Sequence, residues 1–111
     1  MKIDRFVIGP VGTNCYIVRN DDTDECFVTD PAACPLELVG HIRREGLNVK
    51  AVLLTHGHFD HIMGLDDFLK EFPVPVYAFS EEKPLLESAE LNSSLGMFGR
   101  PYTFSGAEYV S

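Results

Sequence analysis

The sequence predicts a mixed α/β fold in which helices cover a β-sheet. Short runs rich in β-branched and aromatic residues alternate with clusters of Gly, Pro, Asn and Asp, a pattern typical of strands joined by turns. Two later segments place apolar residues at helical spacing. Hydrophobic residues make up 45% of the chain and charged residues 23%, which is the balance of a globular domain with an apolar core.

Length and charge narrow the classes of function. The 111 residues suffice for one small domain. A net charge of −8 repels phosphate backbones and anionic lipids, so we expect neither a nucleic-acid nor a membrane partner. The sequence lacks an apolar run of about 18 residues, so we expect no transmembrane helix. The charged start, residues 1–6, is not followed by an apolar segment, so we expect no secretory signal.

The first thirty residues contain three strand-like runs, at residues 3–8, 15–18 and 25–29. Turn-forming residues separate the runs at 9–12 and 20–22. Because short turns join neighbouring strands, we expect these runs to form an antiparallel meander.

A helix is expected next, over residues 35–45. Proline suits a first helical position and Gly46 suits the residue after the end. Its apolar face would consist of Leu36, Leu38, Val39 and Ile42. The nearly unbroken apolar run at 49–54 then predicts a strand that is buried on both faces.

The period becomes helical again from Ile62 to Phe72, and Pro73 ends this second predicted helix. Residues 74–78 indicate a strand, and Pro75 favours an edge or a strand-end position. Ser80 is a candidate N-cap for a third helix that would continue to about residue 91.

The last twenty residues have weaker signals. Residues 92–101 resemble a loop, in which Met97 and Phe98 either border a substrate pocket or belong to a simple surface loop. Two short strand pieces are expected at 102–104 and 108–110, around a turn at Gly106. The predicted order is therefore β-β-β-α-β-α-β-α-β-β.

The three cysteines, Cys15, Cys26 and Cys34, are odd in number and lack the two-residue gap of a zinc knuckle or redox motif. We interpret them as partly buried thiols of a reducing compartment, with a Cys15–Cys26 bridge as the alternative. This interpretation predicts a cytoplasmic location. His41, between Glu37 and Glu45, is expected to be an ordinary exposed histidine.

The residues that could bind a metal are concentrated between Thr55 and Gly64. The pattern His-x-His-x-Asp-His comprises His56, His58, Asp60 and His61, between a buried strand and a helix. Residues two apart in an extended chain point the same way, so the first two histidines can converge on one cation. The carboxylate and the third histidine would face a second position as the chain turns into the helix. Imidazole and carboxylate suit zinc, and also iron or manganese.

Other interpretations of this segment stay open. Asp60 could act as the N-cap of the following helix, a role that does not exclude metal binding. The three histidines could also lie on the surface without a metal, or form a loop that binds metal only adventitiously.

The segment from Thr55 to Gly64 resembles the metallo-β-lactamase superfamily, and within it the glyoxalase II-like (hydroxyacylglutathione hydrolase-like) hydrolases. The segments 13–18 and 28–31 support the resemblance in the expected order. The resemblance implies an αββα sandwich with a one- or two-metal site at the sheet edge. By this resemblance, His56 and His58 would bind the first metal.

The same resemblance assigns further roles. Asp60 and His61 would bind the second metal, and Asp60 would also hydrogen-bond the catalytic nucleophile. Asp30 would be an acid that orients the site without binding the metal; its alternative role is that of an Asp-Pro turn residue. The implied cofactor is zinc, with two ions in the complete family site. The implied reaction is hydrolysis of a thioester, ester or related bond of a small-molecule substrate.

The sequence departs from the family pattern after His61, because no later histidine follows. We therefore expect residues 1–111 to be a single, truncated domain, the N-terminal half of a metallo-β-lactamase-type sandwich. Such a half would expose an apolar sheet face, which favours homo-oligomers. Two hypotheses follow: a metal-dependent hydrolase of which this chain supplies the first half of the metal site, or a non-catalytic metal-binding or interaction fragment.

Overall fold

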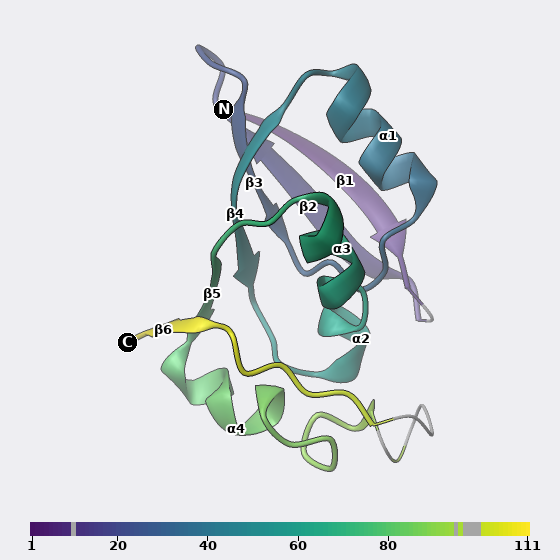
Figure 1. Ribbon diagram of the computed structural model, residues 1–111, viewed down its shortest axis with the longest axis vertical. Helices are drawn as coiled ribbons and strands as arrows, with labels where there is room; N and C mark the ends of the chain where they lie inside the picture. Colours follow the sequence, from purple (N-terminus) through teal and green to yellow (C-terminus); the bar gives the residue numbers. More distant parts are fainter. Residues whose placement is uncertain (10, 95, 97–100) are drawn as a thin grey trace.

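The fold is built on one six-stranded sheet with the strand order β1-β2-β3-β4-β5-β6 (Figure 1). The computed structural model describes residues 1–9, 11–94, 96 and 101–111. The first three strands pair antiparallel and the later ones pair parallel. The strands are β1 (Lys2–Ile8), β2 (Thr13–Arg19), β3 (Glu25–Thr29), β4 (Asn48–Leu54), β5 (Val76–Phe79) and β6 (Glu108–Val110). The predicted α/β class and the N-terminal meander are therefore confirmed.

The helices lie over one sheet face and at one end of the sheet (Figure 1). They are α1 (Leu36–Arg44), α2 (Phe59–Ile62), α3 (Leu65–Glu71), the 3-10 helix η1 (Ser80–Glu82) and α4 (Lys83–Leu86). Figure 1 shows α1 and α3 in front of the sheet. The core contains fully buried side chains from both layers, among them Ile17, Val28, Leu38, Ile42, Val52, Ile62, Leu65 and Phe68. None of the helices in the described ranges is both long and apolar enough to cross a membrane.

The opposite sheet face remains open. Along β1, β5 and β6 it presents Ile3, Val7, Phe79 and Val110, with 45–57% of their surface exposed. The expectation that β4 is buried on both faces is wrong. Its residues Val49, Val52 and Leu54 are buried, but Ala51 and Leu53 on the other face are only half-buried. A strand of this sheet is thus covered on one side, because the described helices pack on that side.

The predicted helix over 62–72 is divided in two, since Gly64 separates α2 from α3. The Gly64 amide donates to the carbonyl of Pro31 at 3.0 Å. A Cβ atom at this position would overlap the backbone of Ala33. The loop after β3 therefore packs directly against Gly64. The apolar repeat of the sequence could not predict this contact, because it involves residues distant along the chain.

Other boundaries also differ from the prediction. The third helix ends at Leu86 instead of residue 91, and Ser80 begins η1 without acting as a side-chain cap. Residues 102–104 are not a strand. β5 lies between β4 and β6, so Pro75 marks a strand end and not a sheet edge. The expectations for Met97 and Phe98 fall outside the described residues.

Two side chains of α1 also contradict their predicted environments. Leu36 is 88% exposed and lies outside the apolar face. His41 is half-buried, because its ring packs edge-on against Phe6 at 5.2 Å and its Nε2 lies 3.5 Å from Asp4 Oδ2. β1 passes beneath α1, and Phe6 on β1 covers His41, which would be exposed on an isolated helix.

Candidate metal centre

The predicted ligands lie on one loop at the C-terminal end of β4. We call residues 55–61 the histidine loop. It leaves the sheet at Leu54 and enters α2, for which His58 occupies the N-cap position without a side-chain cap bond. Asp60 lies within that helix, so the alternative in which it serves as the N-cap is wrong. Because β3 runs parallel to β4, the segment after β3 reaches the same edge of the sheet.

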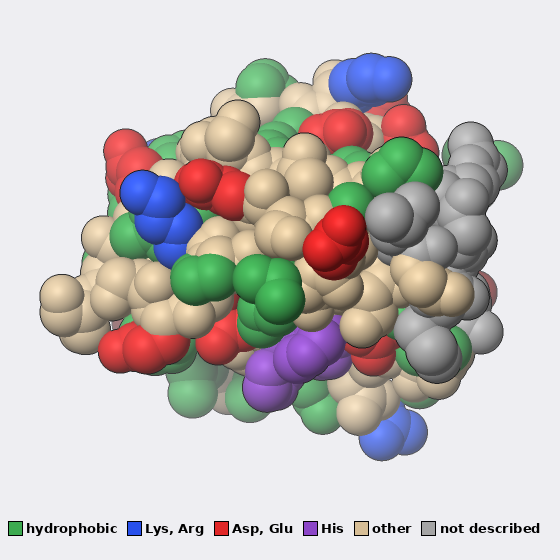
Figure 2. Space-filling view, turned by 90° about the horizontal axis from the view of Figure 1, so that it is seen from below, with side chains coloured by type: hydrophobic (Ala, Val, Ile, Leu, Met, Phe, Trp, Pro, Cys, Tyr) green, Lys and Arg blue, Asp and Glu red, His purple; other side chains and the backbone are tan. Residues whose placement is uncertain are grey.

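The imidazole ring of His56 lies between those of His58 and His61 in the contacts observed. The ring centroids of His56 and His61 lie 4.8 Å apart, and those of His56 and His58 lie 6.1 Å apart. The Nε2 atom of His61 is 3.7 Å from Oδ2 of Asp60. The first two histidines are exposed, whereas Asp60 and His61 are half-buried. Figure 2 shows a group of histidine side chains on this end of the molecule, with acidic side chains beside it.

Asp30 connects the segment after β3 to the histidine loop. Its side chain is buried, and its backbone has a positive φ of 46°, a conformation that Asp tolerates better than most residues. Oδ1 accepts the Thr55 amide at 2.8 Å and Oδ2 accepts the Thr55 hydroxyl at 2.5 Å. The Nδ1 atom of His61 lies 3.3 Å from the same Oδ2. Asp30 thus does more than end a turn, because its carboxylate contacts two residues of the loop.

This contact changes the electrostatics of His61. The hydrogen-bonding interaction with Asp30 raises the pKa of His61. Burial acts in the opposite direction, while the negative charges of Asp30, Asp60 and Glu82 support the increase. A carboxylate on one ring nitrogen leaves the other nitrogen for a different partner, which is the arrangement typical of metal-binding histidines.

A hollow of about 440 Å³ opens beside the loop. It is bordered by the glycine turn after β1, by the end of β3 and by the histidine loop, namely residues 11–14, Tyr16, Thr29, Asp30, Thr55, His56, Asp60 and His61. The Thr13 hydroxyl donates to the carbonyl of Asp60 at 2.6 Å and so ties the start of β2 to α2. Asn14, Tyr16 and Thr29, which border the hollow, come from β2 and β3 of the sheet.

The donor chemistry suits a divalent metal, although the donors do not complete a site. Imidazole nitrogens and a carboxylate are the groups that zinc and iron accept. Within the described part of the chain, no three His, Cys, Asp or Glu side chains are grouped so that they could hold one ion. Catalytic zinc normally has three protein ligands. The described residues alone therefore do not form a complete site for one ion.

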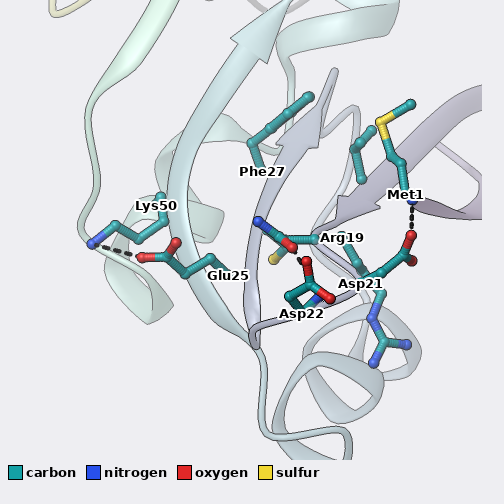
Figure 3. A pocket seen from close by; sticks show the side chains of 10 residues that line it. Met1, Arg19, Asp21, Asp22, Glu25, Phe27 and Lys50 are labelled. Carbon is teal, nitrogen blue, oxygen red and sulfur yellow. Dashed lines mark hydrogen bonds and ion pairs between the residues drawn. The ribbon is translucent and has the colours of Figure 1, made fainter.

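A second hollow, of about 540 Å³, lies at the other end of the sheet (Figure 3). Two pairs of its charged groups contact each other: Lys50 lies 3.8 Å from Glu25, and the N-terminal amine of Met1 contacts Asp21. No histidine borders it. Of these two hollows, only the one beside the histidine loop is bordered by histidines.

Comparison with known proteins identifies the family. The family model described as the metallo-beta-lactamase superfamily matches residues 8–110. The chain belongs to this superfamily. The "Probable metallo-hydrolase YqgX" of Bacillus subtilis is 36% identical over 99% of this chain and 51% of its own length. A "Hydroxyacylglutathione hydrolase" of Vibrio cholerae is 38% identical over 52% of this chain and 22% of its own length.

Solved structures show the same fold. The crystal structure of BLEG-1, a B3 metallo-β-lactamase, matches with a TM-score of 0.87 and 37% identity, over 99% of this chain and 53% of that one. TTHA1623 in a di-iron-bound form matches with a TM-score of 0.78 and 24% identity, over 97% of this chain and 54% of that one. The chain spans about half the length of these two structures and of the Bacillus subtilis relative. The predicted superfamily and the predicted half of its sandwich are confirmed.

Sequence reasoning missed several residues that hold the histidine loop. Thr55 binds Asp30, and Thr13 binds the Asp60 carbonyl. Glu82 accepts the Gly57 amide, and the Asn92 carbonyl accepts the Phe59 amide. Thr13 lies in a segment that carried the family resemblance, but nothing in the local sequence marks Glu82 or Asn92. Their partners are distant along the chain, so only the fold brings them together.

Proposed function

We propose that this chain is the metal-binding N-terminal portion of a metal-dependent hydrolase that acts on a thioester, ester or related bond. In this proposal His56 and His58 hold one zinc ion, and Asp60 and His61 hold a second. The observation that carries it is the gathering of three imidazoles and a carboxylate on one loop beside a hollow. The hydroxyacylglutathione hydrolases among the relatives support a thioester as the substrate class.

Each residue would have a defined task. A bound divalent ion lowers the pKa of coordinated water and stabilises negative charge on a substrate oxygen. Asp60 accepts a hydrogen bond from the attacking water and so orients it. Asp30 holds the His61 ring from its Nδ1 side. The small-molecule substrate occupies the hollow, where residues of the glycine turn border the histidines.

The test is metal analysis of the purified chain after incubation with zinc and desalting. We expect the wild-type protein to retain metal and the His56→Ala/His58→Ala variant to lose most of it. His41→Gln is the control, because His41 lies on α1 against Phe6 and Asp4 of β1 and outside the histidine loop. Unchanged metal content in the double variant would reject the ligand assignment.

A non-catalytic metal-binding fragment is the second candidate function. The incomplete donor grouping among the described residues favours it. Thioester hydrolysis by the 111-residue chain tests whether its site is complete, because two ligands for each ion should hold zinc too weakly for efficient turnover. We expect little hydrolysis by this chain alone, and turnover at the rate of an ordinary enzyme would refute our view that its site is incomplete.

We also propose where the chain works and how it associates. Its three thiols are free, and two of them are buried, which supports a reducing cytoplasm. The apolar residues on the open sheet face support self-association of the isolated chain. Sedimentation of the wild-type chain and of a Val7→Lys/Phe79→Lys variant tests this; a monomer in both cases argues against it.

A further inference from the structure

We infer that Glu82 is a positioning residue of the histidine loop, which it holds by accepting the Gly57 amide between His56 and His58. The expected effect of Glu82 on metal affinity rests on the proposed function, whereas its effect on the geometry of the histidine loop does not. Glu82 lies in η1, directly after β5, and is 25 residues away from Gly57 in sequence.

The contact is short and belongs to a buried piece of backbone. The Gly57 amide donates to Oε1 of Glu82 at 2.8 Å. Gly57 is buried although His56 and His58 on either side are exposed, and Glu82 is half-buried. A carboxylate that accepts a backbone amide forms a stronger hydrogen bond than a neutral acceptor does. The bond therefore fixes the backbone at the point from which both side chains leave the loop.

The glycine itself shows how closely the two segments approach. A Cβ atom at position 57 would lie 2.8 Å from Cβ of Leu85, 3.1 Å from the Glu82 carbonyl oxygen and 3.2 Å from the Leu86 amide nitrogen. The loop backbone thus packs directly on η1 and α4, and a side chain at this position would separate them. Gly57 is required for this contact and not for an unusual backbone angle.

The segment that carries Glu82 is itself anchored. Leu86 is fully buried in the core, and its carbonyl accepts the Phe104 amide at 2.8 Å. Further along the chain, the Asn92 carbonyl accepts the Phe59 amide at 2.8 Å. The amides of Gly57 and Phe59, which flank His58, are therefore both held by the stretch 82–92. Residues 82–92 therefore hold the middle of the histidine loop, while the hydrogen bonds from Thr55 to Asp30 hold its first residue.

The inference distinguishes a hydrogen-bond acceptor from a metal ligand. Glu82→Gln removes the charge but keeps an oxygen that can accept the Gly57 amide. Glu82→Ala removes the acceptor and leaves a buried amide without its partner. A positioning role predicts that the Gln variant behaves like the wild type, whereas a ligand role predicts that both variants fail.

The first measurement needs no metal. In chelator-treated protein, amide hydrogen exchange read by NMR should be at least about tenfold faster at Gly57 in Glu82→Ala than in the wild type. The amide of the fully buried Val52, which donates to the Pro75 carbonyl, is the internal reference for global unfolding. Equal exchange at Gly57 in the two proteins, with Val52 unchanged, would overturn the inference.

The second measurement is zinc affinity by competition with a chromophoric chelator. We expect Glu82→Ala to bind zinc about 10- to 100-fold more weakly, the range typical of residues that orient metal ligands. Glu82→Gln should stay close to the wild type, and Glu81→Ala, at an exposed neighbour in the same helix, is the control. An equal loss in the Gln and Ala variants would overturn the positioning role. Absence of zinc binding in the wild type would reject the proposed function, and the exchange experiment would still decide the role of Glu82.

Discussion

The hydrogen bond between Thr55 and Asp30 is the point at which the fold controls the start of the histidine loop. Thr55→Val removes the hydroxyl and nearly preserves the shape of the side chain. Oδ2 of Asp30, in a buried carboxylate, then loses a hydrogen bond of 2.5 Å. Hydrogen bonds to charged groups contribute about 1.5–3 kcal/mol. We therefore expect the free energy of unfolding to fall by about 2 kcal/mol.

The assay is urea unfolding in the presence of a chelator, so that no metal contributes to stability. With a slope of about 1–3 kcal/mol per molar urea, the midpoint should fall by about 1 M. Thr55→Ser is the matched control, since it keeps the hydroxyl and loses one methyl group from an exposed residue. A Thr55→Val variant within about 0.5 kcal/mol of Thr55→Ser would refute the reasoning, because the hydroxyl would then contribute little.

Other substitutions and pH test the packing around the site. In Gly64→Ala the added methyl group would overlap the Ala33 backbone, and we expect a loss of about 3 kcal/mol by urea unfolding; a loss below about 1 kcal/mol would show that the two segments separate readily. Phe68→Ala empties a fully buried position and should cost about 3–5 kcal/mol in the same assay, so a loss below about 1.5 kcal/mol would contradict the packing. Burial raises the pKa of the Cys15 thiol to about 12 and that of Cys26 to about 11. Thiols of the unfolded chain ionise first, near pH 9.0, so the free energy of unfolding should be at its full value below pH 9 and fall as pH rises through 11 and 12. Cys15→Ala should show a shallower decline with pH. A decline equal to that of the wild type would show that ionisation of Cys15 does not cause it.

Residue patterns within single segments predicted the first three strands and the first helix. The alternation of β-branched residues located β1, β2 and β3 to within two residues at each end, because each strand has one buried face. The proline and glycine that flank α1 located that helix to within one residue. In these segments the propensity of the chain and the packing in the fold favour the same structure.

The errors arose where packing opposed the local pattern. The apolar repeat over 62–72 continues through Gly64, but contact with Ala33 separates α2 from α3. His41 has acidic neighbours along its own helix, yet Phe6 on β1 covers it. Both contacts come from segments that are distant in sequence, and a periodicity confined to one segment contains no information about them.

The candidate metal centre divides in the same way. The sequence alone determined that three imidazoles and a carboxylate lie within six residues, because covalent proximity keeps them together in any fold. Only the tertiary structure decided what holds them. The parallel pairing of β3 with β4 brings Asp30 to His61, and the return of the chain after β5 brings Glu82 to Gly57. Each of these contacts joins residues at least 25 positions apart, whose approach depends on burial of the shared core.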